Sequence, residues 1–338
     1  MRMLSMDDFV ALTNYKISKQ SISKYERGLM MPKPQTLHIL AKALRVPVEY
    51  FSKPTICLSR INYRTKGEIN NAMRESISSI AHDIIERYIQ IEQILDLRPS
   101  FINPLQRISA TTYAEIETAA CILRKKWQLG THPIQSICHL LETFGIMIIE
   151  HHIDSNEFLG FSAFINGVRP VVLINSANHT VERKRFTILH ELGHLLLFTA
   201  RIPKEYTEPE EKLCERFASA VLCPASVLAS ELGVRRNILT LSELISIKQK
   251  YGMSIAAIIH RCHDTGIIST EYYNHVYDNY INHNRIETGW GVYPIPEDTD
   301  RRHRLLKYAI AEQIITKDEA LELGYIEGAK NSPEVIWN

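Results

Sequence analysis

Apolar residues recur every three or four positions along much of the chain, a spacing that predicts amphipathic helices. Three short segments of this kind follow one another at the N-terminus: "LSMDDFVALT", "SKQSISKYERG" and "QTLHILAKAL". Ser5 and Asp8 form a capping-box pattern at the start of the first segment, and Gly28 is typical of a helix end. Residues 1–52 are therefore predicted to be a small unit of compact helices.

A longer helical pattern fills much of residues 53–105, in "INNAMRESISSIAHDIIERYIQIEQIL". Pro99 and Pro104 mark a break after it. The range is predicted to be a mostly helical connector that packs against the next domain, with a coupling helix or a dimer contact as alternatives. One stripe of the helix is expected to hold Ile77, Ile80, Ile84 and Ile91.

Between residues 106 and 270 the pattern changes from helices to strands and back to helices. The segments "YAEIETAACILRKKWQL" and "PIQSICHLLETFG" are helical, and "IMIIEHH", "FLGFSAFI" and "PVVLIN" predict a small sheet. Two further helices follow, in "RKRFTILHELGHLLLFTA" and "EPEEKLCERFASAVLCP". The predicted fold class is α+β and mostly helical, with a short β-sheet in this domain. Residues 271–338 are predicted to be a helical, aromatic extension, in which Pro294 and Pro296 separate a loop from a final pair of helices.

The amino-acid composition leaves the predicted fold unchanged and bears only on the cellular compartment. Hydrophobic residues make up 45% and charged residues 23% of the 338 positions, which is ordinary for a soluble globular protein. Its six cysteines form no CxxC pair, so reduced thiols are expected. Because no run of about 18 apolar residues occurs, no membrane segment is predicted and a cytoplasmic protein is expected.

Charge is balanced overall at +1 but not locally, since the first 50 residues hold eight Lys/Arg against four Asp/Glu. The segment "SKQSISKYERGLMMPKPQTLHILAKALRVPVEYF" resembles the lambda-repressor-like (XRE family) helix-turn-helix domains. In such domains the second helix of the motif enters the major groove of DNA. Only residues 1–4 precede Ser5, so we expect the first helix usual in that family to be missing. The resemblance implies DNA contact, with a solvated helix face as the alternative, by Ser18, Lys19, Gln20, Ser21, Ser23 and Lys24.

The chemistry of the chain is concentrated in "HELGH", residues 190–194. His190 and His194 are four residues apart and so share one face of a helix, where both can bind one metal ion. Glu191 lies beside them as a candidate general base. Two satisfied histidines in a buried helix are the alternative. A catalytic zinc needs a third protein ligand, and Glu211 and Glu215 of the next helix are one turn apart and can both face the histidines.

Residues 106–270 resemble the ImmA/IrrE family of zinc metallopeptidases, whose zincin-like core carries HExxH. The similar segments include "LRKKWQLGTHPIQSICHLLETFGIMII", "RKRFTILHELGHLLL", "EEKLCERFASAVLCP" and "YGMSIAAIIHRCHDTGIIS". The family's third ligand opens an E-x-x-A-[ND]-x-F-A segment. The resemblance therefore implies Zn²⁺ on His190, His194 and Glu211. Cys214 replaces the usual alanine, and Glu215 replaces the usual Asn/Asp, which makes Glu215 the reserve ligand or a partner of a ligand.

The two resemblances together imply a helix-turn-helix fused to a peptidase. Such a fusion implies a cytoplasmic endopeptidase that cleaves a partner transcriptional repressor with metal-activated water, and Glu191 is the expected base. The alternative is a non-enzymatic regulator or antitoxin that binds a protein partner through the peptidase-like domain. A homodimer rests on the repressor analogy alone. By analogy with other zincins, Asn175 or a backbone N–H of "PVVLIN" is expected to hold the substrate. The candidates for the donor that stabilises the oxyanion are Tyr206, His260 and Tyr272.

Overall fold

The computed structural model describes residues 5–44, 46, 48, 51, 56–108, 110–177, 180–198 and 208–326. Contacts within the chain group it into two compact units, Met1–Ile56 and Cys57–Asn338.

The first unit contains the three predicted helices, α1 (Met6–Leu12), α2 (Lys19–Glu26) and α3 (Pro34–Leu44). Ser5 and Asp8 form the predicted capping box of α1. Gly28 has a φ of +66° just after α2, the left-handed conformation in which glycine ends a helix without strain. Ile22 and Leu40 are buried in a small core between the helices.

The second unit is built on a four-stranded sheet with the order β1-β3-β4-β2. The strands are β1 (Leu58–Thr65), β2 (Met147–His151), β3 (Phe158–Ile165) and β4 (Arg169–Asn175). β3 pairs antiparallel with both β1 and β4, whereas β2 and β4 are parallel. β2, β3 and β4 confirm the three predicted strands, and β1 was not predicted. Its side chains are mostly half-buried, because it lies at an edge of the sheet, so it lacks the apolar run that marked the others.

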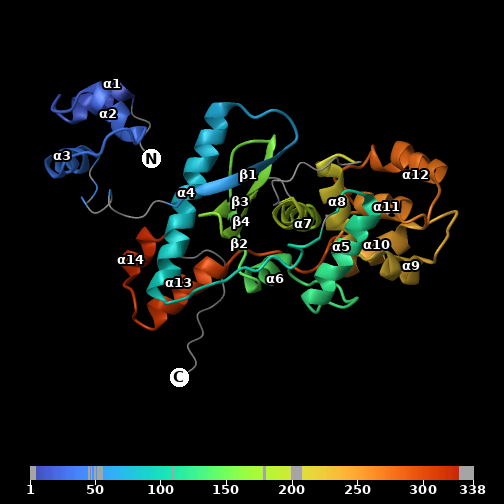
Figure 1. Cartoon of the computed structure of the whole chain (residues 1–338). Helices are drawn as coiled ribbons and strands as arrows, with labels where there is room; N and C mark the ends of the chain where they lie inside the picture. The colour runs from blue at the N-terminus through green and yellow to red at the C-terminus, as the bar shows by residue number, and fades with distance from the viewer. Residues whose placement is uncertain are drawn as a thin grey trace. The chain divides into compact units, whose positions relative to one another are not determined.

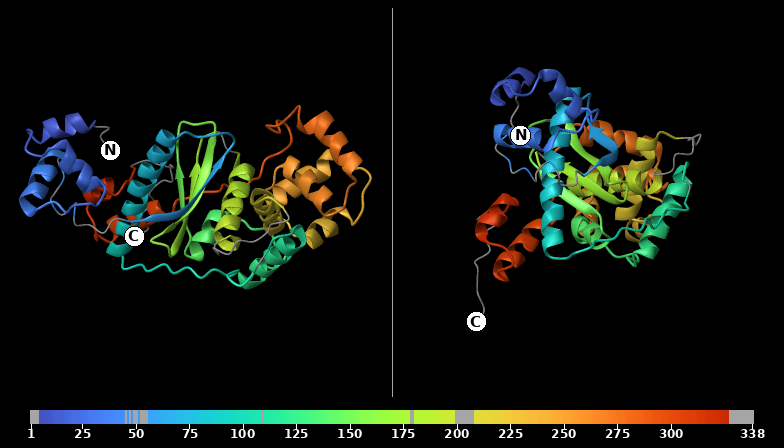
Figure 2. Two further views of the ribbon diagram at one scale, coloured as in Figure 1. Left: turned by 45° about the horizontal axis from the view of Figure 1, so that its top comes forward. Right: turned by 60° about the vertical axis from the view of Figure 1, so that its left-hand side comes forward.

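Two long helices cover the two faces of this sheet, α4 (Asn71–Ile94) on one and α7 (Val181–Leu197) on the other (Figures 1 and 2). α4 confirms the predicted helix, but its buried stripe differs from the prediction, because Ile80 and Ile84 are only half-buried. Ile77 and Ile91 are buried as predicted, and Ala81, Ile85 and Tyr88 complete the buried stripe.

On the side away from the sheet, α7 is covered by further helices, so that it is buried along most of its length (Figure 1). The most extensive contacts are between α7 and α8 and between α8 and α5. The final pair of helices, α13 and α14, confirms the prediction for the C-terminal segment. The bounds of the remaining helices are α5 (Tyr113–Lys126), α6 (Ile137–Thr143), α8 (Glu210–Leu222), α9 (Ala225–Leu232), α10 (Leu241–Tyr251), α11 (Ile255–Asp264), α12 (Thr270–Val276), a π-helical turn (Tyr277–Ile281), α13 (Arg301–Ala311) and α14 (Lys317–Glu322).

A buried ion pair fixes the loop before α13 to α7. The side chains of Arg185 and Glu297 are both fully buried, with Nη1 and Oε2 2.6 Å apart. Arg185 also donates to the backbone oxygen of Gln135 at 2.8 Å, and Glu297 accepts from the backbone nitrogen of Cys138 at 2.8 Å. Because both charges are paired and hydrogen-bonded, the cost of burying them is largely offset. The ion pair thereby anchors the first turn and a half of α7, next to the histidine segment.

Among the described residues, no single helix is long and apolar enough to cross a membrane. Only α8 and α9 taken together have the required length and composition, and they bend by 57° at the break between them.

Candidate metal centre

α7 brings two imidazoles together in the interior of the second unit. Thr180 caps the helix by accepting from the backbone nitrogen of Arg183. One turn separates His190 from His194, so their side chains share a face of the helix. Their Nε2 atoms lie 3.2 Å apart, and both residues are buried.

α8 approaches α7 closely because of the small residues at their contact. A Cβ atom at Gly193 would lie 3.0 Å from the Sγ atom of Cys214 and 3.3 Å from its Cβ atom, which is tighter than ordinary van der Waals contact. Cys214 is completely buried, as expected for a small apolar residue. The glycine in HELGH thus lets α8 lie against α7, and the N-terminus of α8 reaches the histidines.

Glu211, in the first turn of α8, completes a group of three ligand atoms. Its Oε2 atom is 3.1 Å from Nε2 of His190, and its Oε1 atom is 3.3 Å from Nε2 of His194. The ligand atoms of the three residues all lie within 4.8 Å of one another. Ligands at about 2.0–2.1 Å in a tetrahedron around zinc are about 3.3 Å apart. The observed separations fit a divalent metal ion of this size.

The protonation states of these groups differ because their surroundings differ. Burial lowers the pKa of His190 to about 4, so its imidazole is neutral at pH 7 and able to bind a metal. Hydrogen bonds with His190 and His194 lower the pKa of Glu211 below its usual value. Burial opposes charge on His194 as well, but hydrogen bonds with Cys214, Glu210 and Glu211 outweigh it and raise its pKa. A bound metal ion would displace that proton.

Glu191 is fully buried beside the histidines and has one occupied and one free oxygen. Ser162 of β3 donates its hydroxyl proton to Oε2 at 2.7 Å. Oε1 is buried without a partner among the described residues. Burial raises the pKa of Glu191, which brings it closer to the pH at which a carboxylate both takes and returns a proton. Ser162 therefore orients a base whose second oxygen is available for chemistry.

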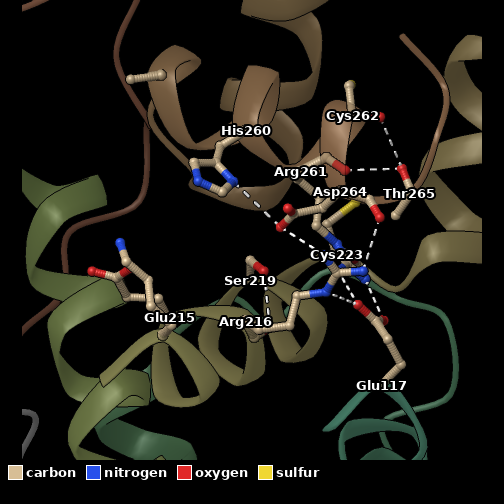
Figure 3. Close-up of polar contacts among 12 residues, drawn as sticks. Glu117, Glu215, Arg216, Ser219, Cys223, His260, Arg261, Cys262, Asp264 and Thr265 are labelled. Atoms are coloured by element: carbon tan, nitrogen blue, oxygen red, sulfur yellow. Dashed lines mark hydrogen bonds and ion pairs between the residues drawn. The ribbon is translucent and has the colours of Figure 1, made fainter. Parts of the chain in front are cut away.

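Of the two further carboxylates on α8, the structure brings Glu210 rather than Glu215 to the histidines. Glu210 Oε1 lies 2.9 Å from Nδ1 of His194, the arrangement in which a carboxylate orients a metal-binding imidazole. Glu215, the reserve ligand of the sequence analysis, pairs instead with Lys212 at 2.8 Å. Glu215 lies one helical turn past Glu211, on the side of α8 where a second polar cluster is found (Figure 3). A carboxylate of α8 does accompany a metal-binding histidine, but the prediction that Glu215 supplies it is wrong.

The second cluster joins α5, α8 and α11 through buried ion pairs (Figure 3). Glu117 is paired with both Arg216 and Arg261, and Asp264 lies 2.9 Å from Arg216. Asp264 is also 3.3 Å from Nδ1 of His260. These charges neutralise one another, and Arg216, Arg261 and Asp264 are among the residues that line a cavity of about 280 Å³. The cluster therefore holds the helices behind the metal group in place.

The structure also places the candidates for substrate contact. His260 lies in the second cluster, and the hydroxyl of Tyr272 hydrogen-bonds to the backbone of Leu239. Tyr206 lies outside the described residues. The Asn175 side chain is buried and bonded to the backbone of residues 153, 155 and 158, and β4 is an inner strand. Asn175 and β4 are thus structural, and the expectation that they hold a substrate is wrong.

A groove of about 230 Å³ instead runs beside the metal group along the edge strand β1. Asn62 of β1 and Ser162 of β3 line it together with His194 and Glu210. The sequence did not predict that β1 lines this groove, because nothing in residues 58–65 indicates a functional strand. Glu210, by contrast, could have been suspected, since it directly precedes Glu211 at the N-terminus of the helix.

In the first unit, the residues expected to contact DNA lie on α2 and its cap. Ser18 caps the helix by accepting from the backbone nitrogen of Ser21, and Lys19 is paired with Asp7 at 2.9 Å. The side chains divide by exposure: Ser18, Lys19, Gln20 and Lys24 are exposed, whereas Ser21 and Ser23 are half-buried.

Two stretches of the chain match models of known families. Residues 141–263 match the IrrE N-terminal-like domain, Peptidase_M78, and residues 1–51 match the helix-turn-helix model HTH_3. The first match includes both histidines, Glu191 and Glu211, but not β1. No curated protein matches the chain. Both resemblances of the sequence analysis are thereby confirmed.

Proposed function

We propose that this chain, which joins a helix-turn-helix to an IrrE N-terminal-like peptidase domain, is a zinc-dependent endopeptidase that cleaves a partner transcriptional regulator. The observation that carries the proposal is the convergence of three ligand atoms of His190, His194 and Glu211 next to the free oxygen of Glu191. Two neutral imidazole nitrogens and one carboxylate are the donor set of catalytic zinc, which leaves a further position open. Zinc bound there would polarise a carbonyl group and make water nucleophilic at neutral pH.

The chain's own residues supply the proton transfers. Glu191, held by Ser162, takes a proton through Oε1 from the attacking water as the O–C bond to the peptide carbonyl forms. The carbonyl π electrons move to its oxygen. When they return, the C–N bond breaks, and Glu191 delivers the proton to the leaving amine. Glu210 keeps Nδ1 of His194 engaged, which leaves Nε2 for the metal.

The groove along β1 supports a peptide substrate. β1 is at the edge of the sheet, and no described strand pairs with its outer side. An extended peptide can therefore add to this edge by backbone hydrogen bonds while its scissile bond lies near the metal group. The fused helix-turn-helix supports a DNA-associated protein as the substrate. All six cysteines are free, which supports a cytoplasmic location, where thiols stay reduced.

Metal binding is tested by zinc content and zinc affinity of the purified full-length chain. We expect one zinc per chain, lost on His190→Ala. Glu210→Gln should weaken zinc binding by about 10-fold, and the matched Glu215→Gln variant should leave it unchanged. Protein that stays metal-free in excess zinc at neutral pH would contradict the proposed site.

Cleavage is tested in a way that lets the substrate identify itself. New protein N-termini are compared by mass spectrometry in cells that express the wild-type chain or the Glu191→Gln variant. We expect cleavage of a transcriptional regulator in the wild type only, with zinc retained in the variant. Cleavage that persists in Glu191→Gln would refute the role of the base. Zinc binding without any Glu191-dependent cleavage would favour a non-enzymatic regulator that binds its partner through this domain.

A further inference from the structure

Arg64 of β1 is a half-buried residue to which neither the ion pairs nor the proposed proton transfers give a role. Its Nη1 atom is buried and has no hydrogen-bond partner within the described part of the chain. Leaving a buried donor without an acceptor is unfavourable, and more so when the donor is charged. A buried donor without a partner in the protein can be explained by a ligand that supplies the acceptor, and the surroundings of Arg64 support this explanation.

The register of the sheet points Arg64 toward the metal group. Directly opposite residues of antiparallel strands project from the same face. Asn62 is opposite Ser162, and Arg64, two residues on, is opposite Gly160. Ser162 contacts Glu191 of α7, so this face is the one that α7 covers. Gly160 has no side chain to fill the space opposite the guanidinium.

The charges around Arg64 are those of the proposed site. Burial lowers the pKa of Arg64, whereas the carboxylates of Glu191, Glu215 and Glu211 raise it. The charge of Arg64 in turn acts on Glu191 and His190. Yet Arg64 forms an ion pair with none of these carboxylates, all of which the structure describes. The guanidinium of Arg64 is therefore close enough to interact electrostatically with these groups, but it forms no salt bridge with them.

We propose that Arg64 donates a hydrogen bond from its guanidinium to the carbonyl oxygen of the scissile peptide bond and stabilises the negative charge that develops there. This inference rests on the peptidase function proposed above. As the water oxygen bonds to the carbonyl carbon, the π electrons move to the carbonyl oxygen, which becomes an oxyanion. Arg64 stays protonated throughout and transfers no proton. A preorganised donor aimed at this oxygen in a buried site lowers the barrier without reorganising.

Arg64 fits this role better than Tyr272 and His260, the two described donors among those suggested by the sequence. The Tyr272 hydroxyl is bound to the Leu239 backbone, and His260 is engaged with Asp264. A counterion for the acidic metal group is the competing role for Arg64. That role predicts altered zinc affinity, whereas an oxyanion donor predicts a loss of turnover with zinc affinity retained.

The first test measures kcat and KM of the full-length zinc-loaded chain on the protein identified by the N-terminal comparison. Arg64→Met should lower kcat by about 100-fold, with a smaller change in KM and an unchanged zinc affinity, and Arg64→Lys should restore part of the rate. Arg74→Met is the matched control, because Arg74 of α4 lies 5.6 Å from the ring of Tyr63, which points to the opposite face. Unchanged kcat in Arg64→Met would overturn the inference and leave the peptidase proposal intact. Weakened zinc binding with normal turnover at saturating zinc would assign Arg64 as a counterion.

The second test does not depend on turnover and decides between the two roles if no cleavage is found. A phosphinic pseudo-tripeptide of alanine carries a tetrahedral anionic centre that resembles the oxyanion intermediate. Calorimetric titration of the zinc-loaded chain should show binding that Arg64→Met weakens by about 100-fold and Arg74→Met leaves unchanged. Equal affinity of the wild type and Arg64→Met, or no binding to the wild type at millimolar concentration, would overturn the inference.

Discussion

Gly193 of α7 faces Cys214 of α8. Because glycine has no side chain, the two helices can pack closely together at this point. A Cβ atom there would lie 3.0, 3.3 and 3.4 Å from Sγ, Cβ and Cα of Cys214. Favourable carbon contacts lie at about 3.5–4.0 Å, so Gly193→Ala forces the helices about 0.5 Å apart or rotates the thiol. Overpacking of this kind costs about 1–3 kcal/mol, and alanine returns about 1 kcal/mol in a helix interior. The net loss expected for Gly193→Ala is about 0–2 kcal/mol.

The same substitution should behave differently once the thiol is removed. In a Cys214→Ala background the nearest remaining contact is 3.3 Å, so the helix preference of alanine should dominate. Gly193→Ala is then expected to be neutral or stabilising by up to about 1 kcal/mol. The interaction between the two substitutions should amount to about 1–2 kcal/mol.

Urea unfolding of the full-length, metal-free chain, followed by tryptophan fluorescence, measures this cycle. All three tryptophans follow residue 100, so the signal reports only on the second unit. Zinc affinity of the same four proteins shows whether the helix separation reaches Glu211. Additive effects within about 0.5 kcal/mol would refute the contact as the reason for the glycine.

Two further predictions concern other parts of the chain. Burial raises the pKa of Glu142 to about 7 from its usual value of 4.5, so ionising it opposes folding, and this cost grows as the pH rises from about 4.5 to 7. Glu142→Gln should therefore be more stable than the wild type above pH 7, by up to about 3 kcal/mol, and equal to it below pH 4.5; a gain that does not depend on pH in urea unfolding would contradict this cause. In the first unit, selection from random-sequence DNA should yield a bound site. Lys24→Ala should weaken binding to all sequences and reduce the salt dependence by about one counterion, whereas Gln20→Ala should relax the preference at one base pair. Unchanged binding by both variants would place the interface elsewhere.

The sequence determined the features that depend on local periodicity. The spacing of four between His190 and His194 requires a shared helix face, and the alternation of apolar runs located β2, β3 and β4. Local capping signals likewise predicted α1 from Ser5 and Asp8. Each of these follows from the geometry of one element, which neighbouring residues in the chain fix by themselves.

Only the tertiary structure decided which distant residues meet at the site. β1 pairs with β3 across about a hundred residues, and no pattern in its own eight residues shows that Arg64 is opposite Gly160 or that Asn62 is opposite Ser162. The sequence analysis considered Glu215 and not Glu210 as the partner of a ligand, and it is the packing of α8 on α7 that brings Glu210 to His194. That packing includes the close approach of Gly193 to Cys214, a contact between two helices that neither helix specifies alone.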